Sequence, residues 1–227
     1  MLDLLRSALE IAAPDDCAVC GLPGSALCDR CSSLLVPVGG SCCRACGHPW
    51  RTPVPTCRAC LPGLPAARAA IVYDHRARRL ISAFKDTGRV RLAERLAQLI
   101  VEAVPRPQVT ALVPVPLTRR RRAERGFNQS ALIARAVAAI WDLPVAEVLE
   151  RTRDGRPQRG QGGRARRSGL AGTFVAARAP QSVVLVDDVH TTGATLAACA
   201  RALRAGGTGR VAAVTLARAP ISSIGRI

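Results

Sequence analysis

Residues 183–195 read VVLVDDVHTTGAT, and this stretch decides the fold class of the chain. An apolar, β-branched run leads to Asp187 and Asp188, and a short loop of threonine and glycine then opens into an expected helix. Backbone N–H groups in such a loop and at a helix N-terminus favour a phosphate dianion, and threonine hydroxyls add donors. Carboxylates accept hydrogen bonds from sugar hydroxyls or hold Mg²⁺. The stretch therefore predicts a ribose phosphate clamp at the end of a strand.

The surrounding residues alternate between strand-like and helix-like patterns. We expect strands at 70–73, 111–116, 182–186 and 211–216, and helices at 76–84, 92–104, 128–141 and 194–205. Such alternation predicts an α/β fold with a mostly parallel sheet flanked by helices, and ligands at the carboxyl ends of its strands. The chain has no GK[ST] after a glycine-rich turn, which excludes a Walker A phosphate loop.

Cysteines dominate the chain before residue 65, where nine of the ten lie among scattered prolines and glycines. They include four C-x-x-C pairs: Cys17/Cys20, Cys28/Cys31, Cys43/Cys46 and Cys57/Cys60. Each C-x-x-C pair forms a zinc knuckle, a turn that holds two thiolates on one metal ion, and two knuckles complete a tetrahedral Cys₄ site. Four thiolates leave no open position for water, so we expect two structural Zn²⁺ ions. The simplest partition places two zinc ribbons in series, and an interleaved partition is the alternative.

The remaining candidates for metal binding are few. Cys42 is an alternative ligand because it adjoins Cys43, and His48 follows the third knuckle closely enough to be considered. Cys199 lies in an expected helix and is interpreted as a buried apolar residue. We place a boundary at the proline- and glycine-rich stretch ending at residue 65, with an N-terminal helix and double zinc ribbon in 1–65 and the α/β domain in 66–227.

The chain is strongly basic. Its 227 residues carry 33 Lys+Arg against 16 Asp+Glu, a formal net charge of +17. Two Cys₄ zinc sites would lower this to about +13, which still favours a polyanionic partner. At 48% hydrophobic residues the chain can bury a core, which excludes global disorder.

The apolar stretches are too short and too interrupted for membrane insertion or export. None approaches the roughly 20 residues that a membrane span requires. Residues 1–13 are expected to form a short amphipathic helix, and Asp3 stands where a secretory signal would carry positive charge. We therefore expect a cytoplasmic protein in a reducing compartment, where clustered cysteines indicate metal rather than disulfides.

The loop at 183–195 resembles the phosphoribosyl pyrophosphate (PRPP) motif of type I phosphoribosyltransferases. Two further segments narrow the resemblance to the ComF family: VPVP at 113–116 followed by RGFNQ at 125–129, and the opening segment AIVYDHRARRLISAFK at 70–85. An N-terminal helix, cysteine knuckles and a phosphoribosyltransferase-like domain follow each other in that family, so the resemblance covers nearly the whole chain.

The resemblance implies roles for particular residues. Asp187 and Asp188 would contact the ribose hydroxyls as the catalytic pair, and Mg²⁺ would bridge the pyrophosphate of PRPP. The 5′-phosphate would be wrapped by Thr191, Thr192, Gly193, Ala194 and Thr195. Residues 151–174 would form the hood over the active site, where Gly155, Gln161 and Gly169 replace the Thr, Leu and Asn typical of the family. These departures affect the contacts to an acceptor and leave the PRPP loop intact.

Two arginine clusters lie on either side of the expected site. Residues 119–125 carry five arginines against one acid, and residues 151–167 carry seven against one. Arginine suits phosphate because its planar fork can bond bidentately, although a solvated surface explains any single arginine equally well. The candidate ligands for pyrophosphate, substrate or DNA are Lys85, Arg119, Arg125, Arg151, Arg153 and Arg166.

Three functions fit these patterns. The first is a competence-type protein that binds PRPP and single-stranded DNA in DNA uptake and natural transformation, with a competence helicase implied as a further partner. The alternative is an active phosphoribosyltransferase that transfers phosphoribose to an unidentified acceptor and releases pyrophosphate. The third is a module that binds PRPP without turnover. We favour the first because the charge exceeds the need of a small-substrate enzyme, and with six aromatic residues in all we expect weak sequence selectivity.

Overall fold

A central parallel sheet organises the molecule. The computed structural model describes residues 16–50, 52–58, 60, 62–63, 65–87, 89–152 and 172–220. The sheet has four strands in the order β1-β6-β5-β2, all parallel. They are β1 (Ala66–Val72), β6 (Arg210–Arg218), β5 (Ser182–His190) and β2 (Ala111–Pro114). The expected α/β class with a mostly parallel sheet is confirmed, and the expected 1–13 helix lies outside the described residues.

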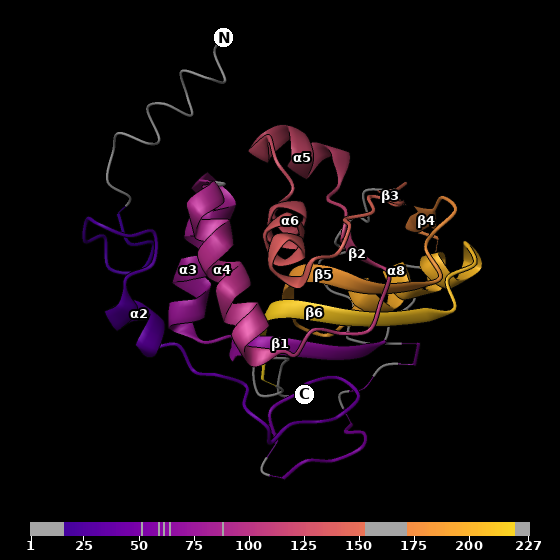
Figure 1. Ribbon diagram of the computed structural model, residues 1–227, viewed down its shortest axis with the longest axis horizontal. Coiled ribbons are helices and arrows are strands. Elements are labelled where there is room, and N and C mark those ends of the chain that lie inside the picture. The colour runs from indigo at the N-terminus through magenta and orange to yellow at the C-terminus, as the bar shows by residue number, and fades with distance from the viewer. Residues whose placement is uncertain are drawn as a thin grey trace, which may run out of the picture.

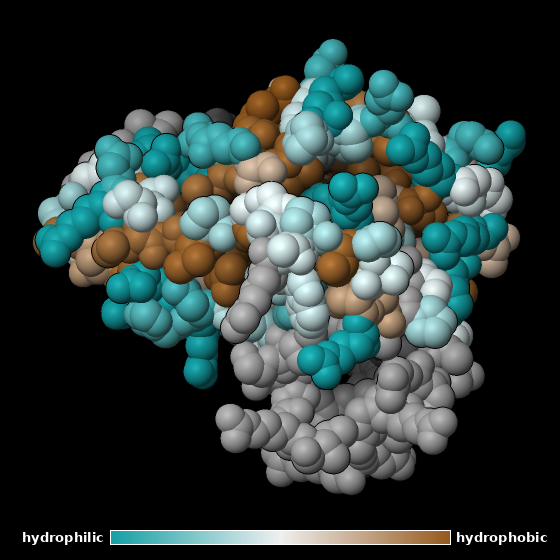
Figure 2. All heavy atoms as spheres, turned by 90° about the horizontal axis from the view of Figure 1, so that it is seen from below, coloured by the Kyte–Doolittle hydropathy of each residue, from teal (hydrophilic) through white to brown (hydrophobic). Residues whose placement is uncertain are grey.

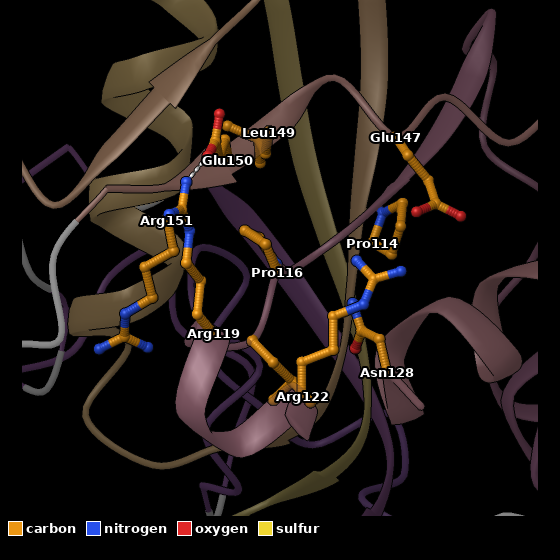
Figure 3. A pocket seen from close by; sticks show the side chains of 10 residues that line it. Pro114, Pro116, Arg119, Arg122, Asn128, Glu147, Leu149, Glu150 and Arg151 are labelled. Atoms are coloured by element: carbon orange, nitrogen blue, oxygen red, sulfur yellow. Dashed lines mark hydrogen bonds and ion pairs between the residues drawn. The ribbon is translucent and has the colours of Figure 1, made fainter. Parts of the chain in front are cut away.

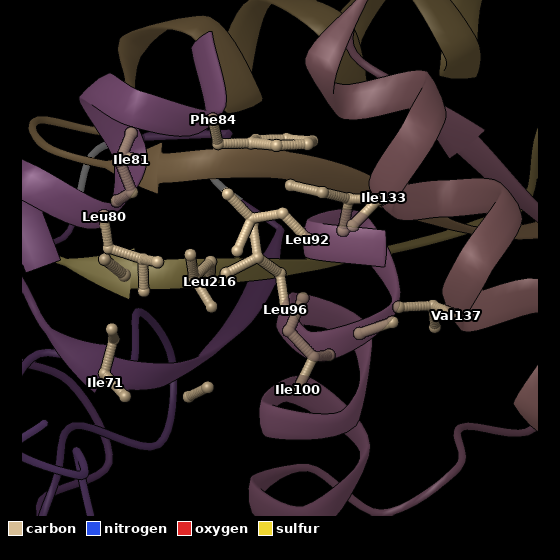
Figure 4. Close-up of a cluster of buried hydrophobic side chains, with 14 of the residues drawn as sticks. Ile71, Leu80, Ile81, Phe84, Leu92, Leu96, Ile100, Ile133, Val137 and Leu216 are labelled. Carbon is tan, nitrogen blue, oxygen red and sulfur yellow. The ribbon is translucent and has the colours of Figure 1, made fainter. Parts of the chain in front are cut away.

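Helices cover both faces of this sheet (Figure 1). One face packs against α3 (His75–Thr87), α4 (Val90–Ala103) and α6 (Gln129–Trp141), and the other against α8 (Ala194–Ala205). Leu96 of α4, Ile133 of α6 and Leu216 of β6 all belong to the larger core (Figure 4). Cys199 of α8 is fully buried in the smaller core, as predicted. Side chains alternate along β5, with Val184 and Val186 in the larger core and Val183 and Leu185 in the smaller one.

Three of the four strands are longer than the sequence pattern indicated, whereas β2 ends at Pro114, two residues before the expected end at residue 116. β1 begins four residues before the expected start at residue 70, and β5 continues through Asp187 and Asp188 to His190. Both extensions follow from pairing with β6, which continues the ladder to Arg218 opposite His190. The expected end of β5 at residue 186 is therefore wrong, and both acids lie in the last part of the strand, where it still pairs with β6, rather than in a loop.

Four short elements were not expected from the sequence. They are α2 (Asp29–Ser33), α5 (Arg119–Arg125) and an antiparallel pair of β3 (Leu149–Arg151) and β4 (Phe174–Ala176). Helix α5 is capped by Thr118, whose hydroxyl accepts from the Arg121 N–H, and it ends at Gly126 with φ of 78°. A glycine suits this end because the left-handed conformation has no Cβ penalty there. The first arginine cluster is thus a helix with defined ends.

The cysteine-rich segment covers the free edge of β1. The Val72 N–H donates to the Val36 carbonyl at 2.7 Å, the Val38 N–H donates to the Ala70 carbonyl, and the Ala67 N–H donates to the Ala45 carbonyl at 2.8 Å. Covering an edge in this way satisfies backbone groups that would otherwise be open to other chains. The second half of the cysteine segment is consequently joined to the sheet by backbone hydrogen bonds.

The surface beside the first cysteine segment is partly apolar. Hydrophobic residues lie among hydrophilic ones toward the left of Figure 2, the side on which Figure 1 places α2. Leu34, directly after α2, and Leu22 are 46% and 58% exposed. No helix in the described part of the chain combines the length and the apolar character that a membrane crossing needs.

Candidate ribose phosphate site and metal centres

The eight knuckle cysteines form two separate tetrads. Cys17, Cys20, Cys28 and Cys31 make the first cluster, and Cys43, Cys46, Cys57 and Cys60 make the second; within each, all sulfur atoms lie within 4.8 Å of one another. The serial partition is therefore confirmed and the interleaved one is wrong. Cys42 and His48 belong to neither cluster among the described residues, and His48 instead packs edge-on against Trp50 at 5.9 Å between ring centres.

The sulfur spacing fits a tetrahedral zinc ion. Three of the sulfur–sulfur separations are 3.9 Å for Cys20–Cys28 and 3.6 Å for both Cys43–Cys60 and Cys46–Cys57. Zn–S bonds of about 2.3 Å in a tetrahedron place sulfurs about 3.8 Å apart. A disulfide needs about 2.05 Å. Both clusters thus have the donor set and the dimensions of a structural Cys₄ zinc site.

The thiols of each cluster differ in acidity. Burial raises the pKa of Cys17 and Cys43, but nearby backbone N–H groups outweigh it and bring these pKa values down to about 6 and about 7. Burial and the neighbouring sulfurs raise the pKa of Cys31 and Cys60 to about 12. Four thiolates repel one another when crowded, and a divalent cation removes that repulsion. A bound divalent cation would therefore stabilise the thiolate form of both clusters.

The two acids of β5 have different partners. Asp187 Oδ1 accepts hydrogen bonds from the Ser130 hydroxyl and from the Asp188 N–H, both at 2.9 Å. Asp188 Oδ2 lies 2.6 Å from Lys85 Nζ, and the Asp188 side chain is only 8% exposed against 27% for Lys85. Burial and the adjacent Asp188 charge raise the pKa of Asp187 to about 7, against the Ser130 hydrogen bond, which lowers it. Near neutral pH the Asp187 carboxyl can consequently accept or donate a hydrogen bond.

The loop after these acids is short. Three residues, Thr191, Thr192 and Gly193, connect the end of β5 to α8, which begins at Ala194. Gly193 has φ of 80° and forms the N-cap, and the Thr192 hydroxyl accepts from the Ala194 N–H at 3.3 Å. The first N–H groups of a helix have no intrahelical partner and are available to an anion. Thr195 lies in this first turn, so the predicted phosphate-binding residues are brought together.

A cavity of about 340 Å³ opens between the segment that follows β2, helix α5 and strand β3, and neither Asp187 nor Asp188 lines it. Figure 3 shows Arg119 and Arg122 extending into it from α5, with Arg151 of β3 at its side. Arg119 pairs with Glu150 at 3.2 Å, and the Arg151 guanidinium lies 5.3 Å from the centre of the Phe174 ring. The predicted ligands Arg119 and Arg151 thus share one cavity.

The turn before α6 connects this cavity to the acids. Asn128 lines the cavity, caps α6 by accepting from the Ser130 N–H, and donates to the Val115 carbonyl. Ser130, two residues further on, holds Asp187. The arginine-lined cavity and the acid pair therefore lie near each other at the carboxyl ends of β2 and β5, where Pro114 pairs with Val186.

Some predicted ligands lie elsewhere. Arg125 donates to the Gln129 side chain at 3.1 Å and does not line the cavity, and Lys85 faces Asp188 instead. Arg153 and Arg166 lie outside the described residues. Two contributors were missed: Ser130, which lies in the helix expected at 128–141, and Arg122, which belongs to the cluster already noted at 119–125.

Comparison with known proteins supports one family. The chain is 30% identical to Competence protein F of Haemophilus influenzae over 78% of this chain and 84% of that protein. It is 31% identical to DNA utilization protein YhgH of Salmonella typhi over 92% of this chain and 99% of that protein. It is 27% identical to Competence protein ComFC of Bacillus subtilis over 86% and 85%. No protein-family model matches the chain. The length and level of these similarities show that the chain belongs to the ComF family.

Proposed function

We propose that this protein binds PRPP at the β5–α8 edge and single-stranded DNA along its arginine face, and that it acts in DNA uptake and utilization. The observation that carries the proposal is the placement of Asp187 and Asp188 near the end of β5, two residues before the loop into α8. Ser130, which bonds Asp187, lies two residues after Asn128 of the arginine-lined cavity. The relatives named for competence and DNA utilization support the same role.

In this proposal each part of PRPP meets a complementary group. The ribose hydroxyls bond to the Asp187 and Asp188 carboxylates, and the 5′-phosphate lies against the first turn of α8. Arg119, Arg122 and Arg151 neutralise the pyrophosphate. Mg²⁺ supplies charge neutralisation to such a pyrophosphate, and the two carboxylates are the hard oxygen donors that suit it here. Lys85 now holds Asp188 and would gain the incoming anion as a second partner.

A thermal unfolding series tests PRPP binding. The zinc-loaded protein is heated with Mg²⁺ and either PRPP, ribose 5-phosphate or pyrophosphate. A ligand at 100 times its dissociation constant adds about 2.7 kcal/mol to the free energy of unfolding. We expect stabilisation by PRPP in the wild type and in the control Glu102→Gln, an exposed carboxylate of α4. We expect none in Asp187→Asn/Asp188→Asn, and equal stabilisation of all three proteins would contradict the proposed site.

The α5 arginines are the proposed DNA contacts because they are exposed and lie at the same edge as the cavity. Each neutralised phosphate of a single strand contributes about 0.7 to the slope of log affinity against log salt. Arg119→Gln/Arg122→Gln should lower that slope by about 1.4 for a labelled oligonucleotide followed by fluorescence anisotropy. Arg201→Gln/Arg210→Gln removes the same charge from exposed arginines of α8 and the amino end of β6 and serves as the control. An equal decrease of the salt slope in both double variants would mean that net charge alone drives binding and would contradict a DNA contact specific to α5.

Phosphoribosyl transfer is the second candidate function. The arginine-lined cavity has the size of a small-molecule site, for which about 300–1,000 Å³ is typical, and an acceptor could enter there. Catalysis in such a site is mainly positioning and electrostatics, so it needs no obvious general base. Release of pyrophosphate from PRPP on addition of an acceptor, lost in Asp187→Asn/Asp188→Asn, would favour the enzyme over the binding protein.

A further inference from the structure

A fully buried arginine, Arg218, ends the β6 strand. Its Nη1 donates to the carbonyls of His190 at 2.9 Å, Thr191 at 2.6 Å and Ala219 at 2.8 Å, and its Nε donates to the carbonyl of Cys46 at 3.3 Å. No carboxylate pairs with it among the described residues. Burying a charge is costly unless hydrogen bonds compensate for the lost water. These four carbonyls compensate Nε and Nη1, whereas the buried Nη2 has no hydrogen-bond partner among the described residues.

Three of the four carbonyls lie in two segments that are far apart in the sequence, and the fourth belongs to Ala219, the residue after Arg218. His190 ends β5 and Thr191 begins the loop of residues 191–193, here called the phosphate loop, whereas Cys46 is a sulfur donor of the second cysteine cluster. His190 is itself buried, and burial together with the Arg218 charge lowers the pKa of its ring to about 3, which keeps it neutral. A single guanidinium therefore connects the second cluster to the loop without a competing charge from His190.

The third knuckle is held firmly against the sheet. The Ala67 N–H donates to the Ala45 carbonyl at 2.8 Å, and Arg68 Nη1 donates to the Arg44 carbonyl at 2.7 Å. Gly47 has φ of 64°, and a Cβ at this position would lie 2.8 Å from the Ala67 carbonyl oxygen. A change in the metal cluster therefore moves either the knuckle or the groups bonded to it.

The first cluster has no such connection in the described part of the chain. Its Cys17 and Cys31 pack in the larger core with the residues of α3 and α4, on the face of the sheet opposite to α8. Its backbone hydrogen bonds are local, such as those from Cys17 to Leu22 and from Gly21 to Cys17. The two clusters thus differ in their route to the phosphate loop, which makes each a control for the other.

We propose that Arg218 is a positioning residue that couples metal occupancy of the second cluster to the geometry of the phosphate loop. Metal at Cys43, Cys46, Cys57 and Cys60 fixes the Cys46 carbonyl, Arg218 then fixes the His190 and Thr191 carbonyls, and the first turn of α8 is held ready for an anion. The effect on PRPP affinity rests on the function proposed above; the effect on the loop does not.

Hydrogen exchange followed by mass spectrometry tests the coupling without any ligand. We compare the zinc-loaded full chain with Cys57→Ser/Cys60→Ser, which disables the second cluster, and with Cys20→Ser/Cys28→Ser, which disables the first. Exchange in residues 190–195 should become at least about tenfold faster in the second-cluster variant only. Residues 131–138 of α6 report any global loosening. Equal effects of the two variants on residues 190–195 would overturn the coupling.

Arg218→Lys separates the arginine from the metal. A lysine keeps the charge but has no planar fork with which to reach carbonyls of both segments. This variant should keep two zinc ions and an unchanged α6, and should show the same local increase in exchange. Loss of zinc, or unchanged exchange at 190–195, would contradict the role of Arg218. If the wild type fails to bind PRPP, the proposed function fails while the exchange data still decide the coupling.

Discussion

Replacing Lys85 by methionine would leave Asp187 and Asp188 without the cation that now faces them. The Lys85–Asp188 separation of 2.6 Å corresponds to a Coulomb energy of about 6 kcal/mol at an effective dielectric constant of 20. Desolvation offsets much of this energy because the Asp188 side chain is 8% exposed. We expect Lys85→Met to lower the free energy of unfolding by about 3 kcal/mol, which is the cost of an unpaired buried carboxylate.

A double-mutant cycle isolates the pair. Asp188→Asn should cost about 1 kcal/mol, because it also relieves the repulsion from Asp187, and the double variant should cost about 2 kcal/mol, giving a coupling of about 2 kcal/mol. Urea unfolding at pH 7.5 with excess zinc supplies the four values. The exposed Arg120–Glu124 pair, at 2.7 Å, is the control and should couple by less than about 0.5 kcal/mol. A Lys85–Asp188 coupling no larger than the control would refute the reasoning.

Three further predictions follow from the same structure. Gly47→Ala should destabilise the fold by about 2–3 kcal/mol, whereas Gly39→Ala, also at positive φ but with no atom nearby, should cost about 1 kcal/mol; urea unfolding compares them. The pKa of Asp187 is raised to about 7 in the folded protein, so the free energy of unfolding should fall as the pH rises from about 4 to 7. Relative to Asp187→Asn, the fall should reach up to about 1.4 kcal/mol per pH unit. The same pH dependence of unfolding in the wild type and in Asp187→Asn would contradict the raised pKa. Metal analysis should find two zinc ions per chain and one in Cys57→Ser/Cys60→Ser, and a single zinc in the wild type would contradict the two-cluster assignment.

Periodicity along the chain predicted the architecture well because the buried strands and helices carry their patterns locally. Both ends of the helix at 194–205 were predicted correctly. Gly193 marks where the helix starts, and the spacing of the apolar residues after it marks the face that is buried. The end of β5 was misplaced because pairing with β6, and not the local sequence, extends the strand through the acids. The β3–β4 pair was missed because three-residue strands leave almost no alternating pattern to detect.

The candidate site was predictable where its residues are close in sequence. The C-x-x-C spacing defined the cysteine pairs, and the acids of β5 and the threonines that follow them lie within nine consecutive residues. Contacts between distant segments were not predictable: the ion pair of Lys85 with Asp188 joins α3 to β5, and Ser130 reaches Asp187 from α6. The role of Arg218 was not predictable from the sequence. An arginine at the end of an apolar strand is usually exposed, and only the structure shows that this one is buried.

Calorimetric titration of PRPP with Mg²⁺ into the two-zinc protein tests the central claim most directly. We predict one site per chain in the wild type, no measurable binding in Asp187→Asn/Asp188→Asn, and binding close to wild type in Glu102→Gln. A zinc-loaded, folded wild type that gives no heat of binding with PRPP at any concentration tested would contradict the claim that the β5–α8 edge is a PRPP site.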